Sequence, residues 1–316
     1  MLTLSSTLAA QETASRTAYD CAAVRAAIYA WTGYRSFDYL AADMVGGKSA
    51  SLKARMVVAL GKLGAARLAL AIVSRASHGA DIFIFARQAV PDDLAREALE
   101  TNEQTQVVVL GAGLDTSGLR IGAERRAAGK AAGKFFEVDL PATQAEKRRL
   151  VARLVQTRRD LSEGNLIYVP CSFGEAELGA ALRGAGFDPS RPAIWIWSGV
   201  VHYLTDAAVR ATVTQLRQLS APGSKLFFDF IPLEAYEKPH EYGFATAKAR
   251  FDKFGEVMSF GLRHGTEQMR EWLRSQGFAL VRTYTHVDMM ALYEQKTGKP
   301  VPSKAPPWLN LCIAAI

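Results

Sequence analysis

The sequence has few cysteines, and they are not arranged to hold a metal or a disulfide network. Its 316 residues include three, Cys21, Cys171 and Cys312, which lie far apart and form no C-x-x-C pair. The pattern argues against a zinc ribbon and against a disulfide-stapled fold, because both need closely spaced cysteines. Unpaired cysteines are typical of proteins in a reducing compartment, so we expect a cytoplasmic location.

Long apolar runs are also lacking. The most apolar stretch, residues 56–73, is interrupted by Lys62, Arg67 and two glycines, whereas a transmembrane helix needs roughly 20 predominantly apolar residues. The first residues, MLTLSSTLAAQE, contain no basic segment and only a short apolar run, unlike a signal peptide. We therefore expect no membrane partner.

The charge balance is mildly basic and the composition is that of a folded protein. Hydrophobic residues make up 49% of the chain, and 38 Lys and Arg against 31 Asp and Glu give a net charge of +7. The basic stretches 125–134 and 147–159 fall on expected helices, with the acids Glu146 and Asp160 nearby and no interleaved aromatic residues. Stacking on bases needs such aromatics, so no nucleic-acid partner is expected.

The pattern of the chain changes near residue 105. Before it, Ala-rich segments with helical spacing predict a helix over 15–31, one longer amphipathic helix over about 49–77, and a helix that opens at Pro91. After it, short continuous apolar runs alternate with helical segments. We therefore expect a helical N-terminal extension over 1–104 and a second domain over 105–316.

The apolar runs of the second part predict strands buried on both faces. They lie at 106–110, 135–138, 166–169, 193–197 and 225–231, with an antiparallel closing pair at 279–286 and 309–316. Helices are expected between them, at 141–160, 175–183, 206–220 and 266–276. This alternation is typical of a doubly wound α/β fold with a mostly parallel sheet. The aromatic stretch 232–264 is irregular and predicts a lid insertion.

A glycine loop is the strongest local signal. In VVVLGAGLDT, residues 107–116, a buried strand leads directly into Gly111, Ala112 and Gly113. Glycines at this point let the backbone turn sharply and approach a ligand closely. Because ligands of such sheets bind beyond the carboxyl ends of the strands, we expect a cofactor at this loop.

The loop alone leaves two cofactor classes open. A dinucleotide fingerprint requires a third glycine, where this chain has Thr116, whereas a nucleoside without a pyrophosphate needs only the first two. Asp139 follows the second strand, and its carboxylate can accept both ribose hydroxyls of either cofactor. At this point NAD and S-adenosylmethionine both fit.

Several strings occur in an order that resembles one known family. They include SRTAYDCAAVRA (15–26), IFARQAVPDDL (84–94), VVVLGAGLDT (107–116), FFEVDLPATQAEKRRL (135–150) and GFDPSRPAIWIWSGVVHYL (186–204). In these strings the chain is similar to the leucine carboxyl methyltransferase-like group of class I S-adenosylmethionine-dependent methyltransferases, and within it to bacterial small-molecule and polyketide O-methyltransferases. The similarity runs from about residue 15 to the C-terminal end.

The resemblance implies a Rossmann-like fold with a seven-stranded sheet, S-adenosyl-L-methionine as the cofactor, and a role in specialised metabolism. It implies that Arg87 pairs with the carboxylate of the cofactor's methionine part and that Asp139 binds the ribose. Two positions depart from the family. Ser172, followed by Phe173, stands where many members bind adenine with an aspartate, and Ser198 replaces a glutamate after the fourth strand.

The chemistry predicted is methyl transfer to oxygen of a small organic acceptor. A carboxylate, with a pKa of about 4, is already ionised and needs no base. A phenol or enol, with a pKa of about 10, would react faster with one. His202 is the best candidate for that base and His264 the second, and Tyr203, Tyr242 and Phe244 are candidates for acceptor contacts.

Three alternatives remain. The family includes a protein carboxyl methyltransferase, and the two serines allow a homologue that binds cofactor without turnover. A nicotinamide-dependent dehydrogenase is disfavoured by Thr116. No metal site and no particular oligomeric state are predicted.

Overall fold

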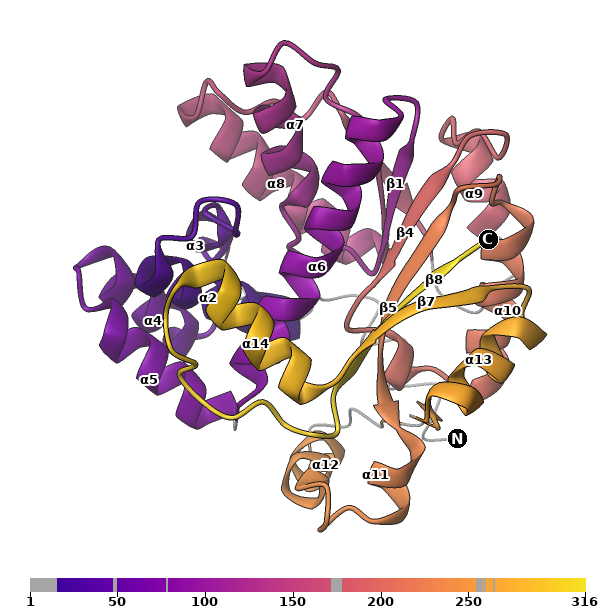
Figure 1. Cartoon of the computed structure of the whole chain (residues 1–316). Coiled ribbons are helices and arrows are strands. Elements are labelled where there is room, and N and C mark those ends of the chain that lie inside the picture. The colour runs from indigo at the N-terminus through magenta and orange to yellow at the C-terminus, as the bar shows by residue number, and fades with distance from the viewer. Residues whose placement is uncertain are drawn as a thin grey trace, which may run out of the picture.

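The fold is built on one central sheet (Figure 1). The computed structural model describes residues 16–47, 50–77, 79–171, 178–253, 258, 260–263 and 265–316. The strands follow the order β3-β2-β1-β4-β5-β8-β7, with the short β6 paired to β5 outside this path. Their bounds are β1 Gln106–Leu110, β2 Lys134–Asp139, β3 Leu166–Pro170, β4 Ala193–Trp197, β5 Lys225–Pro232, β6 Gly261–Leu262, β7 Ala279–Tyr284 and β8 Asn310–Ala315.

The pairing confirms the doubly wound α/β architecture. Strands β1 to β5 pair in parallel, and β8 runs antiparallel between β5 and β7, as the predicted closing pair requires. The main path has the seven strands expected, and β6 adds an eighth of two residues. In parallel strands all carboxyl ends meet at one edge of the sheet, so the loops after β1, β2, β4 and β5 converge there.

Helices cover both faces of the sheet, which explains the continuous apolar runs. Val107 and Val109 of β1 face one hydrophobic core, and Val108 and Leu110 face the other. The first core is covered by α6 Ala80–Thr101, α7 Ser117–Ala127, α8 Pro141–Thr157 and α14 His286–Thr297. The second is covered by α9 Leu178–Gly184, α10 Asp206–Gln218 and α13 Thr266–Ser275.

The N-terminal helices add a further layer over the first core. They are α2 Arg16–Thr32, α3 Ala41–Met44, α4 Leu52–Lys62 and α5 Ala66–Ser77, and α3 to α5 all pack on α2. Within the described residues no single helix is long and apolar enough to cross a membrane. The pair Ala66–Arg75 and Ala80–Thr101, bent by 108°, meets that length and composition test only when taken together.

The single helix expected over 49–77 is wrong, because the structure has two helices there. The chain breaks between α4 and α5 at Gly64, whose φ of 81° is left-handed and ends the first helix. Ser51 begins α4 as its N-cap and accepts a hydrogen bond from the Ala54 amide at 3.1 Å. The break lets the two apolar faces pack on α2 from different directions.

The helix expected to open at Pro91 begins earlier. Pro91 lies inside α6, which starts after the left-handed Gly79 and runs for 22 residues. A proline in mid-helix removes one hydrogen bond and crowds the preceding turn. Here Val90, Pro91 and Leu94 are all buried, so packing outweighs that cost.

The insertion expected at 232–264 contains more regular structure than its sequence indicated. Its described part holds α11 Leu233–Glu237, α12 Phe244–Lys253 and β6. The division at residue 105 stays a prediction. The helices before it and the sheet after it share one hydrophobic core, to which Ile28 and Val107 both belong.

A buried ionic network joins the N-terminal helices to the glycine loop. Arg120 at the start of α7 binds Asp92 of α6 at 2.7 Å, and its Nε lies 3.5 Å from Asp38. The Thr116 hydroxyl donates to Asp38 at 2.5 Å, and Arg25 of α2 binds the other oxygen of Asp38 at 2.7 Å. Arg120 and Asp38 are fully buried, so each charge depends on the others for compensation.

Arg120→Met is expected to destabilise the protein by roughly 3–5 kcal/mol, because it leaves the buried carboxylates Asp38 and Asp92 without their shared cation. Urea denaturation measures the change in the free energy of unfolding. The matched control is Arg210→Met, which breaks an exposed pair with Asp206 and is expected to cost less than about 1 kcal/mol. Equal stability of the two variants would contradict the role of the network.

Candidate functional site

The glycine loop is folded back onto the end of β2. The amides of Gly111 and Ala112 donate to the Val138 carbonyl at 2.8 and 3.1 Å, and the Gly113 amide donates to Asp139 Oδ2 at 2.6 Å. Gly111 and Gly113 have φ values of 71° and 46°, a region that favours glycine. The loop therefore presents its backbone at the carboxyl edge of the sheet, as the sequence predicts.

Asp139 is held in a fixed orientation. Its Oδ2 binds Gly113, and its Oδ1 accepts the Leu140 amide at 2.7 Å. Burial raises the pKa of its carboxyl, and the two amides oppose that shift. Each carboxylate oxygen has a further lone pair, so the group can still accept hydrogen bonds from a ligand such as a ribose.

Arg87 of α6 reaches the edge of the sheet from the helical layer. Its Nη2 donates to Cys21 Sγ of α2 at 3.0 Å, and its Cζ lies 5.4 Å from the centroid of the Phe83 ring. A side chain on Gly199 would place Cβ 2.6 Å from Arg87 Nη1, so the guanidinium lies directly against the backbone after β4. Gly199 also has a left-handed φ of 73°.

Arg87 is a cation available to a ligand. Among the described residues no carboxylate oxygen lies within 4 Å of its guanidinium. Burial opposes its charge, but Cys21, Asp229 and Tyr203 outweigh burial and hold the pKa of Arg87 above its ordinary value. A permanently charged guanidinium is suited to bind a carboxylate through two parallel hydrogen bonds.

A histidine and an aspartate lie together after β4. His202 belongs to the short helix η1 Val201–Tyr203, and its Nδ1 lies 3.8 Å from Asp229 Oδ2. Asp229 is fully buried on β5, and its Oδ1 accepts the Gly199 amide at 2.6 Å. Ser198 precedes Gly199 and is partly exposed. The pair thus links the segment after β4 to the interior of β5.

Asp229 was not among the residues singled out from the sequence. The sequence does contain a signal for it, because Asp229 is the one charged residue in the apolar run Phe227–Ile231 of β5. A carboxylate inside such a strand is costly to bury unless it has a defined partner. Here the Gly199 amide donates to Oδ1, and His202 Nδ1 lies 3.8 Å from Oδ2, beyond hydrogen-bond distance.

The insertion contacts the histidine through its returning segment. The Phe260 amide donates to the His202 carbonyl at 3.4 Å, and the Tyr236 hydroxyl donates to the Phe260 carbonyl at 3.1 Å. The ring of Tyr203 lies 4.3 Å from that of His202, centroid to centroid. The insertion and the segment after β4 therefore meet at this histidine.

The candidates for acceptor contacts differ in exposure. Tyr203 and Tyr242 are partly exposed and pack against the first core. Phe244 is fully buried, with its ring 5.2 Å from Tyr236 and 5.0 Å from Trp308. The remaining candidates, Ser172, Phe173 and His264, lie outside the described residues.

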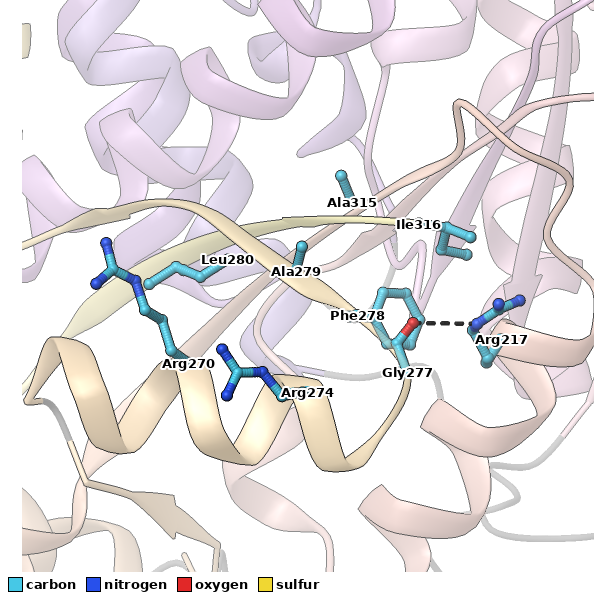
Figure 2. A pocket seen from close by; sticks show the side chains of 9 residues that line it. All are labelled: Arg217, Arg270, Arg274, Gly277, Phe278, Ala279, Leu280, Ala315 and Ile316. Carbon is cyan, nitrogen blue, oxygen red and sulfur yellow. Dashed lines mark hydrogen bonds between the residues drawn. The ribbon is translucent and has the colours of Figure 1, made fainter.

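A cleft on the other edge of the sheet is separate from these residues. It has a volume of about 470 Å³ and lies among Arg217, Arg270 and Arg274, beside the start of β7 and the end of β8 (Figure 2). β7 runs in the direction of β5, and β8 runs against it, so this is the amino edge of the parallel strands. The chemistry of the carboxyl edge does not involve this cleft.

The groups at the carboxyl edge fit a nucleoside with a charged amino-acid tail. Left-handed glycines bring the loop backbone to this edge, Asp139 offers carboxylate oxygens, and Arg87 offers a cation without a carboxylate partner in the described part of the chain. Asp229 Oδ2 is buried and has no hydrogen-bond partner among the described residues. The residues present therefore fit S-adenosylmethionine, and nothing in the arrangement requires a pyrophosphate site.

Comparison with known proteins agrees with this interpretation. Proteins named "Putative S-adenosyl-L-methionine-dependent methyltransferase" in Mycolicibacterium paratuberculosis and Rhodococcus jostii are 32% and 29% identical over 203 residues. The alignments cover 62% and 63% of this chain and 60% and 62% of the relatives, so the chain spans about three fifths of the length of these relatives.

Solved structures share the fold. A DUF574 family protein from Streptomyces avermitilis superposes with a TM-score of 0.54 and 16% identity, covering 91% of this chain and 99% of the other. A protein titled "putative methyltransferase" from Thermobifida fusca also has a TM-score of 0.54, with 19% identity and coverages of 90% and 94%. At these identities the likeness concerns the fold.

The sequence profile of one family, the leucine carboxyl methyltransferases, matches residues 21–217. This match covers most of the helical extension and the sheet as far as α10, and includes Arg87, Asp139 and His202. The resemblance seen in the sequence and its cofactor class, S-adenosylmethionine, are thereby confirmed. The chain belongs to the leucine carboxyl methyltransferase family of S-adenosylmethionine-dependent enzymes.

Proposed function

We propose that the protein is an S-adenosylmethionine-dependent O-methyltransferase that acts on a phenol or enol of a small organic acceptor in specialised metabolism. The observation that carries the choice of acceptor is the buried His202–Asp229 pair at the end of β4. An acceptor that must lose a proton is the kind of substrate for which such a pair is useful.

The binding of the cofactor is assigned to three elements of the carboxyl edge. Arg87 would hold the methionine carboxylate, Asp139 the ribose hydroxyls, and the loop of Gly111 and Gly113 would pack against the nucleoside. S-adenosylmethionine supplies a methyl carbon already activated by its sulfonium, so the protein's task is to align the acceptor oxygen with it. Alignment of this kind can supply roughly 7–11 kcal/mol.

The removal of the acceptor's proton is assigned to His202. A phenol has a pKa of about 10 and is mostly protonated at neutral pH, and a base placed near it contributes about 10²–10⁴-fold to the rate. Asp229, 3.8 Å from Nδ1, would stabilise the imidazolium formed when His202 accepts that proton. The ring of Tyr203, 4.3 Å from that of His202, suits a planar apolar acceptor.

Two other functions make different demands on these residues. A carboxylate acceptor, whether a small acid or a protein C-terminus, is already ionised and would not need His202. A homologue that binds cofactor without turnover would keep Arg87 and Asp139 but transfer no methyl group to any acceptor. The two experiments below separate these cases.

Arg87→Ala is expected to weaken the binding of S-adenosylhomocysteine by about 10- to 100-fold, because it removes hydrogen bonds to a charged carboxylate. Calorimetric titration measures the affinity, with 5′-methylthioadenosine as a second ligand that lacks the carboxylate. Its affinity should not change in the variant. Arg210→Ala, an exposed arginine on α10, is the control. Equal losses for both ligands would make Arg87 a structural residue only.

His202→Gln is expected to lower the rate of methyl transfer to a phenol by about 10²–10⁴-fold while the affinity for S-adenosylhomocysteine stays within about threefold. Initial rates are measured with radiolabelled cofactor on a panel of matched phenols and carboxylic acids. His286→Gln, at the start of α14, is the control. If carboxylic acids are methylated and the variant is equally active, the acceptor is a carboxylate and the proposal for His202 is wrong.

A further inference from the structure

One segment of the chain has an unusual distribution of charge. Between Asp43 and Asp81 the sequence contains no acidic residue. The same stretch contains six cations, namely Lys48, Lys53, Arg55, Lys62, Arg67 and Arg75. It covers α4 and α5, so these two helices form a strongly basic part of a molecule whose total net charge is only +7.

The outward face of α4 is apolar. Leu52 is 86% exposed, Met56 45% and Leu63 81%. With about 100° between successive residues, positions 52, 56 and 63 fall within a narrow stripe of the helix surface. The opposite side, with Ala54 and Val57, is buried, and α4 packs on α2. The helix is therefore apolar on two sides, and only one of them has a partner within the described residues.

Cations flank this stripe on both sides. By the same helical spacing Lys53 lies on one side of it, and Arg55 and Lys62 lie on the other. All three are exposed. Arg55 donates to the Gly47 carbonyl at 3.1 Å, and Lys62 lies 3.7 Å from the exposed carboxylate of Asp43. The contact of Arg55 neutralises no charge, and the exposed ion pair of Lys62 is weak. Most of the positive charge beside the leucines is therefore uncompensated.

The second helix extends the same surface. Leu68 is 54% exposed, and Arg67 and Arg75 are exposed on α5. Leu63 lies just before the turn at Gly64 that connects α4 to α5, and Leu68 lies just after it. Figure 1 shows α4 and α5 at the outer edge of the helical layer, far from β7 and α13. The stripe is thus accessible to a large flat partner.

We propose that the α4–α5 hairpin docks the protein onto an anionic phospholipid surface. Leu52, Met56 and Leu63 would enter the boundary between headgroups and acyl chains. Lys53, Arg55 and Lys62 would extend beside them to the lipid phosphates, with their methylene stems along the apolar stripe. An interfacial helix of this kind lies in the plane of the membrane and does not span it, so the lack of a spanning segment is no obstacle.

The charge pattern favours lipid over a second copy of the chain. A twofold dimer through this surface would bring the same residues of both copies together. The hairpin would then oppose cations to cations, because it contains no acid between Asp43 and Asp81. A surface of anionic headgroups complements the charge and offers an apolar layer for the leucines at the same time.

The experiment is co-sedimentation of the whole protein with vesicles of phosphatidylcholine, and with vesicles of equal parts phosphatidylcholine and phosphatidylglycerol. The wild type is expected to bind the anionic vesicles at least about tenfold more tightly, and binding should weaken as salt is added. One variant removes the apolar stripe, L52Q/M56Q/L63Q, and another removes the cations, K53Q/R55Q/K62Q. Each is expected to lose at least about tenfold in vesicle affinity.

The matched control is V281Q/V287Q. These valines, on β7 and α14 outside the hairpin, are 55% and 58% exposed, and their replacement should leave vesicle binding unchanged. Thermal unfolding verifies that every variant is folded, which is expected because all substituted side chains are exposed. Equal binding to neutral vesicles, no binding to anionic ones, or equal loss in the control would overturn the proposal. So would a dimer, detected by analytical ultracentrifugation, that the stripe variant dissociates without any vesicle binding in the wild type.

Discussion

The buried contact between Arg120 and the carboxylates of Asp92 and Asp38 is the constraint on which the site depends. It joins α6, the loop before α3 and the first turn of α7, with charges that are all withdrawn from water. Thr116, at the place of the third glycine in a dinucleotide fingerprint, donates its hydroxyl to Asp38. The position therefore serves the packing of the loop on the helical layer, and a glycine there would lose this hydrogen bond. The glycine loop is held from two directions, by Asp139 on the sheet side and by this network on the helix side.

Helix α6 carries this structural contact and also Arg87, the residue proposed to bind the cofactor. Gln88 and Asp92, four residues apart, lie on the face that meets the glycine loop, and the Gln88 amide binds both Asp92 and Asp115. Arg87, one position away, points instead toward the backbone after β4. A shift of α6 along its axis would displace the guanidinium and the loop anchor together. The contacts on both sides of Pro91 determine where α6 lies. For this reason the helix tolerates a proline in its middle.

The parts of the fold that the sequence could predict are those encoded locally. Each strand of the parallel sheet is a short apolar run with a clear end, and Gly111 and Asp139 follow two of those ends directly. Helix α14 was missed although Thr285 and Asp288 form a capping box before it and Gly298 ends it with a left-handed φ, signals that local analysis could have used. The pairing of His202 with Asp229 could not be predicted in this way. Asp229 lies on β5 and His202 on the short helix after β4, and the pairing of β4 with β5 brings them together.

That pairing also explains how the site can differ from the family pattern after β4. The resemblance implies a glutamate where this chain has Ser198, so the loop after β4 lacks that negative charge. Asp229 supplies one from the neighbouring strand: its Oδ1 binds the Gly199 amide, and its charge contributes to the raised pKa of Arg87. A carboxylate on β5 is more deeply buried than one in the loop would be, and it faces the imidazole of His202 as well as the guanidinium. One acid thus accepts the Gly199 amide, contributes to the raised pKa of Arg87 and lies beside the imidazole of His202. Asp229 therefore provides, from the neighbouring strand, a buried carboxylate beside the loop in which Ser198 stands.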